Sequence, residues 1–261
     1  MIREHLIEKG VGDNKKFRWR SHEPSRIEGL SDAVFGFAVT LLVVSLEVPK
    51  TFAELMEVMR GFGAFAVCFA LLIVVWYNQY KFFRRYALQD NYTLVLNSAL
   101  LFVVLFYVYP LKFVFTFLFG IFARQGLEVR LANGTTTTMV QSAAEVTTLM
   151  IIFSLGYVAV FGLFVLMYAH AYKNRKRLEL NELEVFDTLT DIRESALNVG
   201  IGSLSVAFAV LARNATLSGM SYMLCPIVMT AHGMIRGKRR RKIEERLGFH
   251  ESSMFEPQPN A

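Results

Sequence analysis

Cysteine is scarce in this sequence of 261 residues. Only Cys68 and Cys225 occur, each within a long apolar run, and two isolated thiols are too few for a disulfide framework. The five histidines show no metal-ligand spacing, and the sequence contains no Gly-x-Ser-x-Gly nucleophile motif. The sequence therefore gives no sign of a catalytic or metal site, and we expect neither enzymatic activity nor a bound cofactor.

Charged residues are also few. They make up 19% of the chain, against 54% hydrophobic residues that include 23 phenylalanines. One apolar run follows Asp32, and five further runs approach or exceed the length of about 20 residues that a bilayer core requires. These five are Gly61 to Tyr80, Asn91 to Leu111, Val146 to Tyr172, Ser195 to Ala212 and Asn214 to Ile235. The pattern predicts an all-α integral membrane protein with six transmembrane helices per chain.

Basic residues are distributed unevenly between the two sides of these predicted spans. One side carries six of the 28, and the side that holds both termini carries the other 22. Because lysine and arginine near span ends resist translocation, we predict that both termini are cytosolic. We also expect the membrane to be a prokaryotic cell membrane. The formal charge of +6 and the basic run from Arg239 to Lys242 indicate contact with anionic lipid, and they require no nucleic-acid partner.

Three regions follow from this arrangement. Residues 1–24 are predicted to form a basic cytosolic arm that lacks the features of a signal peptide, residues 25–246 the six-helix transmembrane domain, and residues 247–261 a disordered cytosolic tail. The spacing of apolar residues in 51–60 predicts a short helix at the outer interface. Residues 124–141 are predicted to form a loop, and residues 173–194 a helical extension of the fourth span into the cytosol.

The first span contains an acid. Only fourteen uncharged residues separate Asp32 from Glu47, which is roughly 21 Å of helix at about 1.5 Å per residue, and a bilayer core is about 30 Å thick. To span the bilayer, the helix must therefore extend beyond Asp32 and Glu47. Ser25 and Glu28 have the form of a capping box, which predicts that the helix begins near Arg26. Asp32 then lies one to two turns inside the helix, and intramembrane acids are candidate functional residues.

One stripe of this helix is almost wholly apolar. At 100° per residue it consists of Phe37, Thr40, Leu41, Val44 and Glu47. Packing against lipid or protein would explain such a stripe, and so would a pore, because rings of apolar side chains gate channels by excluding water. An acidic outer mouth at Glu47 would favour cations. Periodicity alone leaves both explanations open.

The acid points away from this stripe, since Asp32 lies about 140° from Phe37 around the helix. A carboxylate buried in a membrane needs polar partners. We therefore predict that Asp32 is the hub of a polar network at the cytosolic side, drawn from the polar residues expected at the same depth: Asn78, Gln79, Asn97, His170, Arg193, Asn198 and His232.

The sequence resembles the transmembrane protein 175 family of potassium channels, whose first helix carries Arg, three residues and then Phe-Ser-Asp. This chain has Arg26, three residues and Leu30-Ser31-Asp32, followed by an apolar run typical of that family. Trp76-Tyr77-Asn78 and Leu96-Asn97, with Pro110 downstream, resemble its second and third helices. The resemblance is weakest from the fourth span onward. Leu30 replaces the usual Phe, and Gln79 stands where a histidine is common.

The resemblance implies a homotetramer in which the first helices surround a central pore for K⁺ and other monovalent cations. Phe37, Leu41 and Val44 would then form the gate, and Thr40 the hydroxyl ring that favours potassium. Arg26, Ser31 and Asp32 would attach the pore helix to its neighbours. Self-association also follows from geometry, because one chain offers a single copy of the stripe. The sequence lacks a Thr-Val-Gly-Tyr-Gly filter loop, so we expect moderate selectivity.

A second class of function remains open, a proton- or ion-coupled transporter in which Asp32 titrates. The buried acid and two membrane-embedded histidines favour it. The absence of internal repeats and of spans broken by glycine or proline near the middle of the membrane disfavours it.

Overall fold

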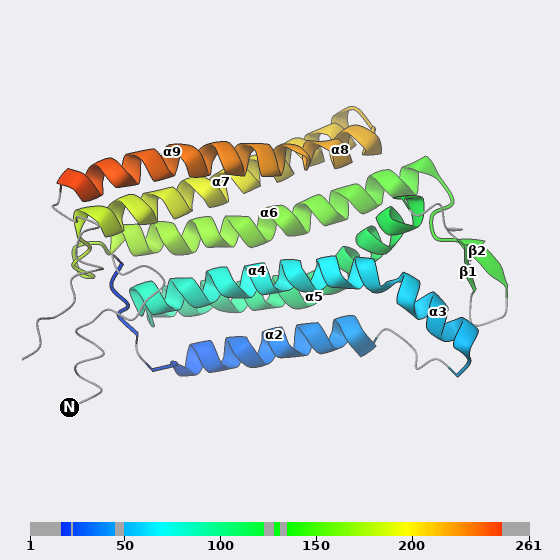
Figure 1. The fold of residues 1–261 in the computed structure, drawn as a ribbon, viewed down its shortest axis with the longest axis horizontal. Helices are drawn as coiled ribbons and strands as arrows, with labels where there is room; N and C mark the ends of the chain where they lie inside the picture. Colours follow the sequence, from blue (N-terminus) through cyan, green and yellow to red (C-terminus); the bar gives the residue numbers. More distant parts are fainter. Residues whose placement is uncertain (1–16, 22, 45–49, 123–127, 131–134, 247–261) are drawn as a thin grey trace, which may run out of the picture.

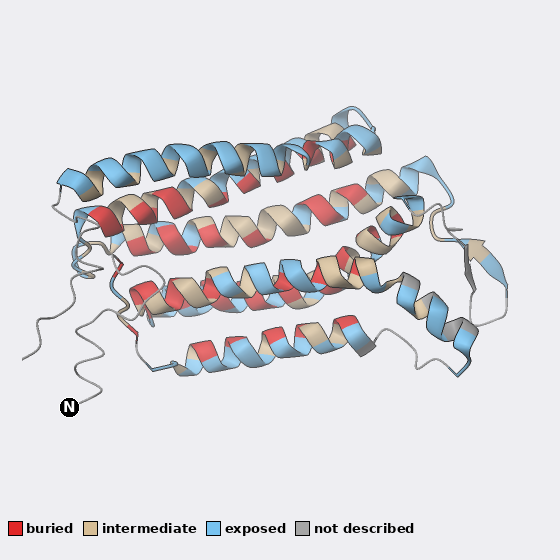
Figure 2. Cartoon of the chain, in the orientation of Figure 1, coloured by how far each residue is buried: buried red, intermediate tan, exposed pale blue. Residues whose placement is uncertain are grey.

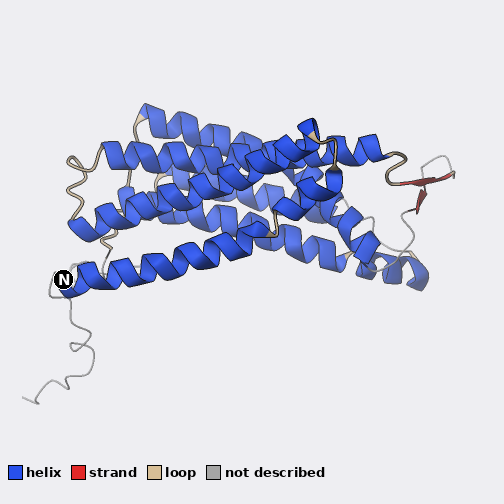
Figure 3. Ribbon diagram, turned by 90° about the horizontal axis from the view of Figure 1, so that it is seen from above, coloured by secondary structure: helices blue, strands red, loops and turns tan. Residues whose placement is uncertain are grey.

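The computed structural model describes residues 17–21, 23–44, 50–122, 128–130 and 135–246. Within these ranges the fold is built almost entirely from helices, and the long ones lie side by side along the longest axis of the molecule (Figures 1 and 3). The long helices are α2 (Arg26–Val44), α4 (Phe62–Tyr86), α5 (Asn91–Phe122), α6 (Ala143–Lys173), α7 (Glu182–Leu211) and α9 (Leu224–Arg246). The predicted all-α class is confirmed.

Four of the described helices, α4, α5, α6 and α7, are long and apolar enough to cross a membrane. They correspond to the second to fifth predicted spans. The membrane-crossing roles of α2 and α9 remain predictions. The first described residues and the carboxyl end of α9 lie at the same end of the bundle (Figure 1), which we call the terminal end.

The connection between α6 and α7 differs from the prediction. The sequence was expected to extend the fourth span beyond Lys173, but α6 ends there and the next helix begins already at Glu182. The reason is a capping box: the Asn181 side chain accepts a hydrogen bond from the Glu184 backbone at 2.8 Å, and the Glu184 carboxylate accepts one from the Asn181 backbone at 3.1 Å. The fifth predicted span is therefore the second half of a longer helix.

The sixth predicted span, Asn214 to Ile235, is two helices. The short helix α8 (Ala215–Ser221) ends before Tyr222, and α9 begins at Leu224. Pro226 explains the interruption, because proline has no N–H to donate to the carbonyl four residues earlier and its ring clashes with that carbonyl. The Tyr222 carbonyl instead accepts the tighter bond from the Cys225 backbone, at 3.0 Å.

The far end of the bundle carries small elements. Helix α3 (Phe52–Arg60) confirms the short helix predicted at residues 51–60. The segment predicted as a loop contains an antiparallel hairpin of β1 (Glu128–Arg130) and β2 (Thr136–Thr138), with Val129 opposite Thr137. Residues 131–134, between the two strands, lie outside the described residues.

Buried aromatic residues form the core at the terminal end, where α4 meets α6. Phe82, Tyr86 and Tyr168 have ring centroids between 5.2 and 6.1 Å apart. Phe17, from the region predicted as a free arm, packs edge-on against Tyr86 at 5.8 Å and is 4% exposed. Residues 17–21 are therefore part of the packed structure, whereas the predicted tail at 247–261 lies outside the described residues.

The two faces of helix α2, a candidate functional site

Helix α2 lies at the edge of the bundle and is held from one side. Its buried side chains, Ser31, Phe35, Ala38 and Leu42, follow the spacing of a single helical face and pack toward α4 and α5. In Figure 2 this face is turned toward the neighbouring helices, and the other side of α2 is exposed. The helix therefore has one attached face and one open face.

The open face carries part of the predicted stripe. Phe37 is 57% exposed and Thr40 is exposed. Leu41 is half-buried, because it lies toward the attached face and packs against the core. The side chain of Val44 and all of Glu47 lie outside the described part of the structure. The structure thus brings Phe37 and Thr40 together on one uncovered surface and places Leu41 at its border.

The hydroxyl of Thr40 has a defined orientation on this face. Its Oγ1 donates to the carbonyl oxygen of Phe37 in the preceding turn at 2.7 Å. Because the hydroxyl proton is used inside the helix, the oxygen lone pairs are left to accept from a donor or to face a cation. The site can therefore present an electronegative atom without a net charge.

A ladder of neutral polar side chains crosses the attached face. Gln79 of α4 donates to the Asn97 carbonyl oxygen at 3.0 Å, and the Asn97 amide donates to Ser31 Oγ at 3.0 Å. Ser31 Oγ in turn donates to the Ile27 backbone carbonyl at 2.8 Å. All three side chains are almost fully buried. We call Ser31, Asn97 and Gln79 the polar ladder, and it joins α2, α5 and α4.

Asp32 is not the hub of this network. Its Oδ1 accepts a hydrogen bond from Trp76 Nε1 at 2.7 Å, and the residue is exposed. Ser31 and Asp32 are 100° apart around the helix. Ser31 therefore meets Asn97 of α5, whereas Asp32 meets Trp76 of α4. Asp32 and Trp76 border an open groove of about 320 Å³ that is otherwise apolar.

Most of the other residues predicted for the network lie elsewhere. Asn78 donates to the Val74 carbonyl of its own helix at 2.9 Å. His170 contacts Asp90, in the connection between α4 and α5, at 2.8 Å. Partial burial raises the pKa of Asp90, but the hydrogen bonds from His170 and Thr93 have the larger combined effect. The pKa of Asp90 is therefore below its ordinary value.

Two more of the predicted residues, Arg193 and His232, lie on α7 and α9 and not beside Asp32. His232 is half-buried and borders a surface hollow between α7 and α9 that also contains Arg193. Arg26, in the first turn of α2, is exposed. Of the predicted network, the structure therefore brings together Ser31, Asn97 and Gln79, and it pairs Asp32 separately with Trp76.

Both ends of α2 are also fixed on the attached side. At its start, Ser25 and Glu28 exchange the two predicted capping bonds at 2.9 and 3.2 Å, and Glu28 lies 3.7 Å from Arg84 at the end of α4. Toward the other end, Lys112 Nζ of α5 donates to the Leu42 carbonyl at 3.2 Å. A cation is favourable there, since the last carbonyls of a helix carry partial negative charge.

Sequence reasoning missed two of these partners. Trp76 was noted only as part of a motif, although its indole N–H is a donor that requires an acceptor when partly buried. Lys112 was counted only as a basic residue on the outer side. Its position inside α5, two residues after Pro110 and followed by further apolar residues, could have indicated a partner within the bundle.

Comparisons with known proteins place the chain in a family of potassium channels. A family model described as the endosomal/lysosomal potassium channel TMEM175 matches residues 26–107, which contain α2, the polar ladder and Trp76. A protein of Marivirga tractuosa named potassium channel is 40% identical over 243 residues, covering 91% of this chain and 98% of the relative. A potassium channel of Streptomyces collinus is 23% identical over 223 residues, covering 82% of this chain and 90% of the relative.

Solved structures show the same relationship. A crystal structure of a variant of the potassium channel MtTMEM175, in complex with a nanobody fusion, superposes with a TM-score of 0.74 at 41% identity, covering 87% of this chain and 100% of that one. A TMEM175 homologue from Chamaesiphon minutus superposes at 0.54 with 20% identity, covering 81% of this chain and 99% of that one, and shows likeness of fold.

The polar ladder gives a testable prediction for stability. Replacing Asn97 with alanine leaves the buried Gln79 amide without its acceptor, and we expect a loss of about 1 to 3 kcal/mol of unfolding free energy. Asn78→Ala is the matched control, because Asn78 bonds only within its own helix in the described contacts. Thermal unfolding of the purified protein in detergent measures both. Equal melting temperatures for the two variants would contradict the role of the ladder.

Proposed function

This chain belongs to the TMEM175 family of potassium channels, and from that premise we propose that it conducts K⁺, and other monovalent cations less well, through a central pore in a prokaryotic cell membrane. The observation that carries the proposal is the asymmetry of α2. One face is attached to its own subunit along its length, and the opposite face presents Phe37 and Thr40 uncovered. A pore lined by this helix requires such an open face.

We propose that four copies of the chain assemble around the axis onto which these open faces point. One chain supplies one copy of the face, so a closed ring of identical subunits is needed to enclose a path. Six spans per chain, counting α2 and α9 with the four apolar helices, are part of this proposal. The position of both described chain ends at the terminal end of the bundle supports cytosolic termini.

Within the proposed ring, Phe37, Leu41 and Val44 form a hydrophobic constriction, and Glu47 is an acidic outer mouth. The exposure of Phe37 supports the first part. Apolar rings close a pore by excluding water. The sequence has no carbonyl filter loop, so selectivity depends on the diameter of the ring and on Thr40. The Thr40 hydroxyl donates to the Phe37 carbonyl, and its oxygen lone pairs are therefore available to a cation.

Membrane lipids complete the proposed surroundings. Five basic residues near the end of α9 are exposed, Lys238, Arg239, Arg241, Lys242 and Arg246, and the last of these contacts Glu182. Arg236 and Arg240 pair with Asp187 at 3.4 and 3.2 Å. The exposed basic residues of α9 lie at the terminal end, where a cytosolic leaflet would present anionic headgroups. Each basic residue near such a surface contributes about 1 kcal/mol of attraction.

Recording from the purified protein in a planar bilayer tests the function directly. Under a K⁺/Na⁺ gradient we expect unitary current steps and a reversal potential displaced toward that of K⁺. A saturating, coupled flux without unitary steps would contradict the channel and support the transporter in which Asp32 titrates. Replacing Asp32 with alanine would then abolish the flux.

The constriction predicts the effect of a single substitution. Phe37→Ala removes the bulkiest ring of the open face, so we expect a larger unitary conductance and more current at rest. Val43→Ala is the control, because Val43 is also exposed in the single chain, at 45% against 57% for Phe37, but lies about 120° from Phe37 around the helix. An unchanged conductance in Phe37→Ala would mean that this residue does not face the ion path.

The hydroxyl of Thr40 predicts a change in selectivity. Thr40→Ala removes the oxygen from the open face, and we expect the reversal potential to shift toward equal permeability for K⁺ and Na⁺. Thr40→Ser retains the oxygen and is expected to keep most of the preference for K⁺. If the alanine and serine variants gave the same reversal potential as the unchanged protein, the hydroxyl would have no part in selectivity.

A further inference from the structure

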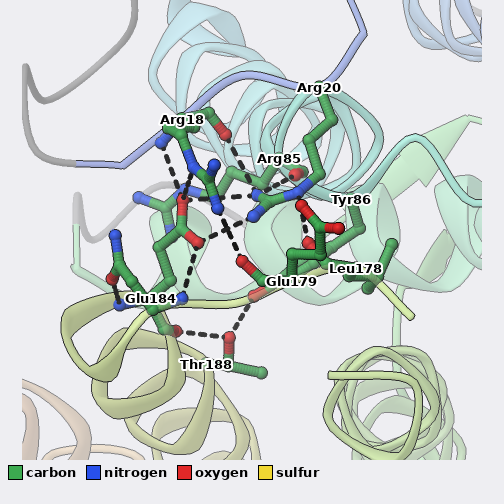
Figure 4. A network of polar contacts seen from close by, with 9 residues as sticks. Arg18, Arg20, Arg85, Tyr86, Leu178, Glu179, Glu184 and Thr188 are labelled. Carbon is green, nitrogen blue, oxygen red and sulfur yellow. Dashed lines mark hydrogen bonds and ion pairs between the residues drawn. The ribbon is translucent and has the colours of Figure 1, made fainter. Parts of the chain in front are cut away.

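A short segment ahead of α2 is fastened to a helix far away in the sequence. The carboxylate of Glu184, in the first turn of α7, is fully buried and lies between Arg18 and Arg20 (Figure 4). Arg20 Nη2 lies 2.7 Å from Glu184 Oε2, and the Arg18 backbone N–H donates to Glu184 Oε1 at 3.0 Å. The Arg18 side chain adds a longer contact at 3.4 Å.

The guanidinium of Arg20 has further partners on two other elements. It donates to the Leu178 carbonyl at 3.0 Å, in the turn before α7, and to the Arg85 carbonyl at 3.1 Å, at the end of α4. The Arg20 backbone N–H also donates to the Arg84 carbonyl at 3.0 Å. The planar fork of arginine suits several acceptors at once, which a lysine ammonium would not reproduce.

Glu184 needs these partners. A buried carboxylate is costly unless it is paired and hydrogen-bonded, and its described bonds from outside α7 and its cap come from the segment at Arg18 and Arg20. The same carboxylate closes the capping box of α7. The start of α7 and the segment ahead of α2 are therefore stabilised by one side chain.

Arg84 continues this connection to α2. It donates to the Ser21 carbonyl at 3.3 Å and lies 3.7 Å from Glu28, which belongs to the capping box that begins α2. One side chain of α4 thus contacts both the segment and the first turn of α2. On the other side, Asp187, one turn after Glu184, is paired with α9 through Arg236 and Arg240.

We propose that Arg18, Arg20 and Glu184 form a clasp that holds the start of α2 back on its own subunit, and that Arg20 and Glu184 are positioning residues for channel opening. The inference rests on the proposed function, in which α2 lines the pore. When apolar side chains that face a water-filled path approach one another, apolar surface is removed from water and the free energy falls. A clasp that holds each α2 away from the axis opposes that collapse and favours the open state.

Single-channel recording of the purified, full-length protein tests the clasp. We expect Arg20→Ala and Glu184→Gln each to lower the fraction of time open by about threefold or more, in the range of couplings through packed networks. Unitary conductance and the reversal potential stay unchanged, because the clasp is outside the pore. The double variant is expected to be no worse than the more affected single one, since both act through the same contact.

Two exposed residues beside the clasp provide controls. Glu179→Gln and Arg177→Ala remove one charge of each sign from the turn before α7, and the backbone carbonyl of Glu179 that accepts from Arg18 is retained. Their open fraction is expected to equal that of the unchanged protein. If Arg20→Ala and Glu184→Gln matched these controls, raised the open fraction, or had additive effects, the clasp would be wrong.

Arg20→Lys keeps the test valid if the larger changes prevent folding. It retains a positive charge beside Glu184 but loses the fork that reaches the Leu178 and Arg85 carbonyls, so a smaller fall in open fraction is expected. An open fraction equal to that of the unchanged protein would contradict the proposal.

The results that would contradict the pore differ from those that would contradict the clasp. Absent unitary currents, or a conductance insensitive to Phe37→Ala, overturn the pore whatever the clasp variants do. Normal currents with a sensitive Phe37, and clasp variants like their controls, overturn the clasp alone.

Discussion

The structure depends on the one-sided attachment of α2. Every described contact that fixes this helix, from the capping box at Ser25 and Glu28 to the Lys112 bond at Leu42, lies away from Phe37 and Thr40. In a bilayer an exposed phenylalanine is solvated by hydrocarbon, so exposure alone does not require a partner. A pore is favoured because that exposure occurs together with the outward lone pairs of Thr40, the polar ladder behind the helix, and membership of a potassium-channel family.

The chemistry of the attachment changes along α2 in a way that suits a membrane. The polar ladder, which meets α2 in its second turn at Ser31, is made of hydroxyl and amide groups that satisfy one another without a charge to desolvate. The ionic contacts gather at the terminal end, where Arg20 meets Glu184 and Arg85 meets Asp191 at 2.9 Å. Neutral bonds thus set the register of α2 against α4 and α5, and charged bonds fix its start relative to α7.

The sequence predicted the long helices because apolar run length and helix caps are local properties. It located the start of α2 and the short helix α3, and helical periodicity placed Phe37 and Asp32 on different sides of α2. The sequence-based prediction was wrong where a single residue begins or interrupts a helix. Asn181 caps a new helix, α7, where an extension of the fourth span was expected, and Pro226 divides the sixth span into α8 and α9. These signals were present but weaker than hydropathy, which averages over many residues.

Partner choice could not be predicted in the same way. Ser31 and Asp32 are adjacent in sequence, and which of them meets Asn97 depends on the rotation of α2 against α5, a property of packing across the bundle. Gln79, a departure from the histidine common in the family, serves as a neutral donor to Asn97. Arg20 and Glu184 are 164 positions apart, and no local pattern joins them.

Accessibility of single cysteines in α2 distinguishes a water-filled path at its open face from contact with lipid. Phe37→Cys, Thr40→Cys and Ala38→Cys would each be made in a background with Cys68 and Cys225 replaced by serine, and current would be recorded during exposure to a charged, water-soluble thiol reagent. If α2 lines the pore, the reagent blocks current at positions 37 and 40 and has no effect at position 38, which faces α4 and α5. Unaffected current at positions 37 and 40, with brominated lipid quenching a fluorophore attached at 37, would contradict it, because the open face would then meet lipid.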